Sequence, residues 1–189
     1  ALNYELLITV LVCSIIYGIS EFLLSFAWRR LLIWFGDKDI STNLCNRIYG
    51  KSQIAKYIPG NVFHVLGRHI LGSQAGIKHI VLAGATVYEI LGLLSISTLI
   101  GFSGMVIFGL GNIYFSLYQI ISILLTTLVI TGLAIPLAPY LMSLRGIIIP
   151  YKGVGDLFLN ISKVYIFYFI FFLIAGLLLV VIVNIFLDI

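Results

Sequence analysis

The sequence predicts an all-α integral membrane protein that has about four transmembrane helices and a re-entrant or interfacial helical segment at residues 41–79. Of its 189 residues, 61% are hydrophobic and only 10% are charged, whereas about 25% of the residues of a soluble domain are charged. The mean hydropathy of +1.17 excludes both a soluble globule and a disordered chain. Several apolar runs also exceed the roughly 20 residues that a membrane-spanning helix needs.

The predicted spans form a single transmembrane domain over residues 1–189, which we expect to be part of a longer domain. The runs lack the alternation and the segments of about ten residues that are typical of a transmembrane barrel, so we expect helices. They extend from about Leu6 to Trp28, Ile80 to Phe108, Tyr114 to Met142 and Val164 to Leu187.

Charge predicts the orientation of these spans in a cell membrane. Eight of the 11 basic residues lie between residues 29 and 78 and the other three between 143 and 163, whereas residues 109–112 carry no charge. The positive-inside rule therefore places the basic loops 29–79 and 143–163 in the cytoplasm. The N-terminus is then outside, which predicts one more helix before Ala1. Because the charges lie beside membrane spans, the net charge of +4 does not indicate a nucleic-acid partner.

Residues 41–79 have a pattern of their own. Ser41 is a candidate N-cap for an interfacial helix, and Pro59–Gly60 should break that helix. Asn61 is a candidate cap for a second helix from Val62 to Leu71, which at about 15 Å is too short to cross a bilayer. A broken backbone followed by a short apolar helix predicts a re-entrant element. The alternative is an amphipathic hairpin that lies flat on the membrane surface.

Two carboxylates, Glu21 and Glu89, lie inside predicted spans, where each would cost about 2–3 kcal/mol at the helix centre. His64 and Arg68 share one face of the short helix, and Arg68 needs an anionic partner if that helix enters the bilayer. Either Glu89 or the phosphate of a lipid could be that partner; alternatively, Arg68 reaches the lipid headgroups without specific binding. The acids therefore indicate either a polar site between helices or structural pairs that hold the helices together.

No catalytic, metal or cofactor site is expected. The three histidines lack metal-ligand spacing, and the chain has no Ser/His/Asp order and no phosphate-binding glycine loop. We expect Cys13 and Cys45 to be free thiols, because their predicted depths in the membrane differ.

The run KYIPGNVFHVLGR at residues 56–68, followed by Gly76 and by the acid Glu89, resembles the transmembrane family of lysylphosphatidylglycerol synthases and flippases. The resemblance covers about residues 5–110. It implies the handling of a lipid-linked anionic or aminoacylated headgroup in a prokaryotic membrane. Members of this family have roughly eight spans in two halves, and this chain supplies about half of them. The soluble aminoacyl-transfer domain is absent, so enzyme activity is not expected.

The leading hypothesis is a flippase or transporter of a membrane lipid or lipid-linked headgroup in envelope biogenesis. The alternatives are a membrane accessory subunit of a glycosyl- or aminoacyltransferase that transports nothing, and a structural scaffold. The expected partners are a phospholipid or lipid-linked substrate, with a second copy of the chain or a transferase as possible protein partners. The candidate lipid-binding residues are Glu21, Lys56, Tyr57, Pro59, Gly60, Asn61, His64, Arg68 and Glu89.

Overall fold

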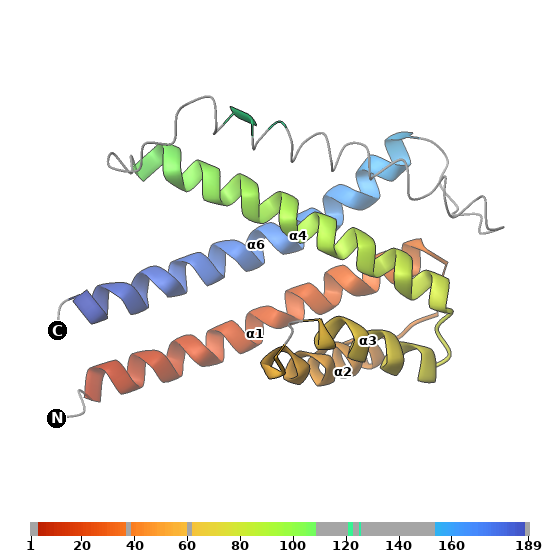
Figure 1. Ribbon diagram of the computed structural model, residues 1–189, viewed down its shortest axis with the longest axis horizontal. Helices are drawn as coiled ribbons and strands as arrows, with labels where there is room; N and C mark the ends of the chain where they lie inside the picture. The colour runs from red at the N-terminus through yellow and green to blue at the C-terminus, as the bar shows by residue number, and fades with distance from the viewer. Residues whose placement is uncertain are drawn as a thin grey trace.

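The computed structural model describes residues 4–36, 39–59, 62–108, 121–122, 125 and 154–187, and its regular structure there is entirely helical. Three long helices are accompanied by a hairpin of two short ones (Figure 1). The long helices are α1 (Tyr4–Trp34), α4 (His79–Phe108) and α6 (Val154–Leu187). The hairpin consists of α2 (Thr42–Gln53), the 3₁₀ helix η1 (Ile54–Tyr57) and α3 (Phe63–Gln74).

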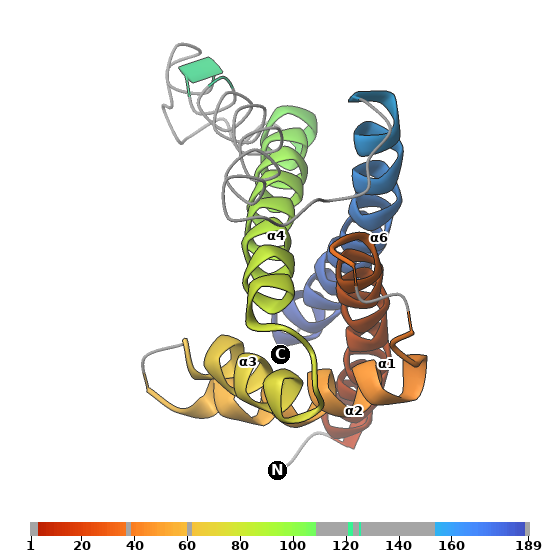
Figure 2. The same ribbon diagram turned by 90° about the vertical axis from the view of Figure 1, so that its right-hand side faces the viewer.

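The three long helices are each long and apolar enough to cross a membrane, which confirms the prediction of a helical membrane protein. Their lengths of 31, 30 and 34 residues correspond to about 45–51 Å, more than the hydrocarbon core of about 30 Å. Helices α1 and α6 run side by side, and α4 packs across both (Figures 1 and 2). The predicted span from Tyr114 to Met142 lies almost wholly outside the described residues.

Two predicted boundaries are wrong, because helix continues into stretches that were assigned to loops. Helix α1 runs past Trp28 to Trp34, and Leu31 and Leu32 in this extension are buried in the core. Helix α6 begins at Val154 rather than at Val164. In both places charged residues ended the apolar run in the sequence, but charge at the end of a span does not interrupt backbone hydrogen bonding.

The hairpin runs back along the C-terminal half of α1. Ser25 donates a hydrogen bond to Asn46 (2.7 Å), and Lys56, further along the hairpin, reaches Glu21, further back on α1 (3.1 Å). The contacting residues come later along the hairpin as they come earlier along α1, so the two segments are antiparallel. The tip of the hairpin therefore lies near the middle of α1, and α2 and α3 lie side by side below α4 in Figure 2.

The local signals in the hairpin act largely as the sequence predicts. Ser41 is the N-cap of α2, and its hydroxyl accepts a hydrogen bond from the backbone N–H of Leu44 (3.2 Å). The helical backbone stops at Ile58, which is extended (φ −82°, ψ 131°) as is usual before a proline. Helix α3 begins at Phe63, with Val62 rather than the predicted Asn61 as its N-cap, and ends at Gln74 rather than Leu71. Gly60 and Asn61 lie outside the described residues.

Gly92 of α4 leaves room for two tyrosine rings of α6. A Cβ atom at this position would lie 2.5 Å from Cε2 of Tyr168, whose side chain is fully buried. We therefore expect Gly92→Ala to lower the free energy of unfolding by about 1–3 kcal/mol, because the buried ring must move. Denaturant unfolding in detergent micelles measures this change. The control is Gly101→Ala in the same helix, where no atom of a described residue lies within 4 Å of the added methyl. Equal stability of both variants would contradict the proposed close packing.

Candidate functional site

The first polar site is a buried cluster formed by Arg68 of α3, Glu89 of α4 and Tyr49 of α2. Arg68 and Glu89 are each only 4% exposed. Arg68 Nη1 donates to Glu89 Oε2, and the hydroxyl of Tyr49 donates to Glu89 Oε1 at 2.8 Å. Both oxygens of the carboxylate are therefore bonded, and one side chain from each of three helices takes part.

Aromatic rings enclose the guanidinium of Arg68. Its central carbon lies 3.9 Å from the centroid of the Tyr49 ring and 5.6 Å from that of Trp28. Such cation–π contacts are strongest where water is excluded. Helix α1, which carries Trp28, thus becomes the fourth helix that contributes to the cluster.

Electrostatics keeps Tyr49 neutral and Arg68 charged. Burial by itself lowers the pKa of Arg68, but the charge of Glu89, the hydrogen bond to it and the neighbouring Tyr49 and Tyr168 together outweigh this effect, and the pKa lies above its usual value. Burial, reinforced by the charge of Glu89, raises the pKa of Tyr49 well above its usual value. Tyr49 therefore stays neutral and continues to donate its hydrogen bond, and Arg68 stays charged.

Glu89 is thus the anionic partner of Arg68, one of the two partners that the sequence left open. The guanidinium is buried between aromatic rings and bonded to a carboxylate. This geometry has the character of a packing pair that joins α3 to α4. It also explains how a carboxylate is tolerated within α4, since a paired charge costs far less than an isolated one.

The second polar site is a cleft of about 750 Å³ between α1, the tip of the hairpin and α6. Lys56 Nζ lies 3.1 Å from Glu21 Oε1 there, and the two side chains are 34% and 19% exposed. One side of the cleft is polar and the opposite side, contributed by α6, is apolar. The lining residues are Cys13, Ser14, Tyr17, Gly18, Glu21, Gln53, Ile54, Lys56, Tyr57, Ala175, Leu178, Leu179 and Ile182.

The cleft can accommodate an amphipathic molecule. Its volume lies within the range of about 300–1,000 Å³ that is usual for small-molecule sites. An ammonium group has three donors, and the bond to Glu21 uses one donor of Lys56. Lys56 can therefore also bind a phosphate oxygen, while the leucines and Ile182 of α6 offer an apolar surface for a hydrocarbon chain.

The predicted site residues divide between these two places. Glu21, Lys56 and Tyr57 line the cleft, whereas Arg68 and Glu89 form the buried cluster. His64 lies one turn before Arg68 on α3, as predicted, but does not line the cleft.

The hairpin tip and the two cysteines were also predicted from the sequence. Pro59 is exposed at the hairpin tip, and Gly60 and Asn61 lie outside the described residues. Cys13 and Cys45 are both buried, and neither forms a disulfide with another described residue.

Tyr49 is the functional residue that sequence reasoning missed. It lies one turn after Cys45 and next to Ile48, and all three side chains are buried. The same periodicity that indicated an amphipathic α2 could have placed Tyr49 on its buried face. That its hydroxyl would reach a carboxylate 40 residues away follows only from the tertiary arrangement, in which α2 packs against α3 and α3 packs against α4.

Comparison of the chain with protein-family models, with curated proteins and with solved structures gives no match in any of the three. The resemblance of residues 56–68 to the lysylphosphatidylglycerol synthase and flippase family therefore stays a prediction from that motif. The described residues contain no group of three or more His, Cys, Asp or Glu side chains that could hold a metal ion. The helices and the two sites define a helical membrane protein that has a buried ion pair and a charged cleft.

The two ion pairs should contribute very differently to stability. We expect Arg68→Ala to lower the free energy of unfolding by about 3–5 kcal/mol, because Glu89 is left buried without its cation. Lys56→Ala breaks a partly exposed pair and should cost no more than about 1 kcal/mol. Denaturant unfolding in micelles, followed by tryptophan fluorescence, compares them. A loss for Lys56→Ala as large as that for Arg68→Ala would contradict this difference.

Proposed function

We propose that this protein is a flippase or transporter that moves a membrane lipid or lipid-linked headgroup in prokaryotic envelope biogenesis. The observation that supports the proposal is the cleft beside the hairpin tip. It combines a cation–carboxylate pair with an apolar wall on a transmembrane helix. A headgroup that crosses a bilayer needs polar contacts at depth, and its acyl chains need continuous apolar surface; this cleft offers both.

The proposal includes a re-entrant hairpin. Both ends of the hairpin lie toward the C-terminal end of α1, and its tip contacts Glu21 near the middle of that helix. If α1 crosses the bilayer, Lys56 lies well below the membrane surface. Helical backbone at that depth is tolerated where it packs against protein, as α2 and α3 do here. We also propose a fourth span at residues 114–142 and cytoplasmic basic loops.

In this proposal the two ion pairs have separate roles. Lys56 binds the anionic or lipid-linked headgroup, with Glu21 holding the ammonium group in position. Arg68 and Glu89 hold the hairpin against α4, since neither side chain is accessible enough to meet a passing headgroup. By holding the hairpin against α4, the buried pair also keeps Lys56 at its depth in the membrane.

The second candidate is a membrane accessory subunit or scaffold that transports nothing. The buried cluster of Arg68, Glu89, Tyr49 and Trp28 favours it, because this part of the bundle is filled by side chains and bonded internally. Measurement of lipid transport distinguishes the two candidates.

The depth of the hairpin can be tested with a spin label at Tyr57, whose side chain is 91% exposed. In reconstituted vesicles, we expect a label on Tyr57→Cys to collide more with oxygen than with a water-soluble nickel complex, because oxygen concentrates in the bilayer core. A label on Asn43→Cys, at the start of α2, is the control and should favour the nickel complex. The native cysteines are buried, so background labelling should be low. Equal access to nickel at both positions would support a hairpin on the membrane surface.

Transport itself is tested with liposomes that contain a fluorescent phosphatidylglycerol and a reductant that bleaches only the outer leaflet. We expect the wild-type protein to accelerate leaflet exchange. Lys56→Gln should slow it by about tenfold, which corresponds to the loss of one charge-assisted hydrogen bond. Lys51→Gln, which removes an exposed charge from the same hairpin, should leave the rate unchanged. Wild-type protein that exchanges no lipid would favour the accessory or scaffold function.

A further inference from the structure

A second cleft, of about 680 Å³, lies between the C-terminal end of α1, the start of α2 and the first turns of α6. Its lining includes two adjacent cations, Arg29 and Arg30, and none of the lining residues that the structure describes is acidic. It shares no lining residue with the cleft at Lys56. We propose that this cleft binds the phosphate group of an anionic phospholipid. This inference rests on the membrane location of the protein and not on its transport activity.

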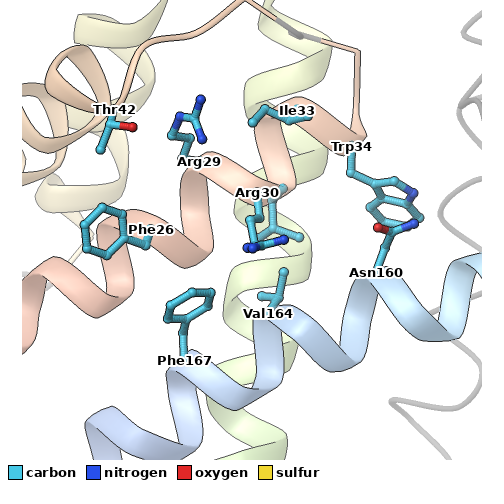
Figure 3. Close-up of a pocket in the computed structure, with 10 residues that line it drawn as sticks. Phe26, Arg29, Arg30, Ile33, Trp34, Thr42, Asn160, Val164 and Phe167 are labelled. Atoms are coloured by element: carbon cyan, nitrogen blue, oxygen red, sulfur yellow. The ribbon is translucent and has the colours of Figure 1, made fainter.

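The two arginines are arranged to leave donors available. Arg29 Nε donates to the backbone carbonyl of Ile40 at 3.0 Å, which orients the guanidinium and leaves its terminal nitrogens for a ligand. Arg30 is exposed, and its guanidinium carbon lies 5.7 Å from the ring centroid of Phe167. Figure 3 shows Arg30 extending from α1 toward Val164 and Phe167 of α6, and Arg29 on the side of Thr42. Planar guanidinium groups match phosphate geometry better than a lysine does.

The apolar part of the cleft continues toward the middle of the bundle. Phe26 lies one turn before Arg30 on α1, and its ring centroid is 6.3 Å from that of Phe167. Phe26 is 37% exposed, so its ring is accessible from outside the bundle. Along both helices the polar residues come nearer the end of the bundle and the phenyl rings lie deeper.

This order of residues specifies the ligand. A phospholipid in one leaflet has its phosphate at the interface and its acyl chains toward the midplane, which is the order that Arg29, Arg30, Phe26 and Phe167 present. A soluble phosphate compound would not use the phenyl rings. A zwitterionic lipid brings a cation next to its phosphate, and none of the described lining residues is an acid that could receive that cation. Basic residues at a membrane surface attract anionic lipids for the same electrostatic reason.

Trp34 lines this cleft and is one of only two tryptophans in the chain, so its fluorescence can report binding. Phosphatidylglycerol with brominated acyl chains is titrated into the full chain in neutral detergent micelles. We expect saturable quenching by this lipid and much weaker quenching by brominated phosphatidylcholine. Trp34→Phe should remove most of the signal. Equal quenching by both lipids would overturn the proposal.

Charge variants then test the arginines. Arg30→Gln should weaken binding by about fivefold, the effect of one basic residue at an anionic lipid, and Arg30→Lys should recover part of the loss. Lys78→Gln, which also removes one exposed charge, is the matched control and should bind as the wild type does. The same weakening in Lys78→Gln, or none in Arg30→Gln, would overturn the proposal. Melting temperatures establish that both variants fold.

Inorganic phosphate distinguishes the two possible sources of the phosphate group. We expect added phosphate to leave lipid quenching unchanged beyond the effect of equal ionic strength from chloride. Specific displacement of the lipid by phosphate would show that the cleft takes a soluble phosphate and would overturn the assignment to a phospholipid.

Discussion

Arg68 carries a permanent charge, yet its side chain is almost completely excluded from solvent, and the structure of the hairpin depends on how that charge is neutralised. Its guanidinium must face Glu89, which determines the side of α4 against which α3 packs. Tyr49 bonds the same carboxylate and brings α2 to the cluster. With both arms of the hairpin positioned in this way, its tip lies beside Glu21 of α1, and the cleft at Lys56 results.

The two ion pairs show how solvent access separates two uses of the same chemistry. Around Arg68, aromatic rings surround the guanidinium and both carboxylate oxygens are bonded, which is the geometry of a pair that holds helices together. Lys56 and Glu21 are partly exposed and border a cavity, so a ligand can reach them. The large desolvation cost of the first pair is offset by packing and hydrogen bonds, whereas the second pair stays partly exposed beside the cleft.

Hydropathy predicted the spans well where the apolar run was uninterrupted, as in α4, which begins one residue from its predicted start. Hydropathy failed at the C-terminal end of α1 and at the N-terminal end of α6. Charged residues near a helix end need only reach the interface, so they do not stop the helix. Arg29 illustrates this point: it remains within α1 and donates to Ile40. The cap at Ser41 and the break before Pro59 were predictable, because each acts through its own backbone and immediate neighbours.

The sequence by itself therefore determined that this is a helical membrane protein, that a broken hairpin follows the first span, and that Glu21, Arg68 and Glu89 need partners. Only the tertiary structure decided that Arg68 pairs with Glu89, that Lys56 pairs with Glu21, and that Tyr49 joins the buried cluster. The physical reason is that composition and periodicity show where a charged residue would have to enter lipid. The free-energy cost of that placement depends on the residue itself and not on its distant neighbours. Which charges meet depends on how helices distant in the sequence pack, and hydropathy does not specify that packing.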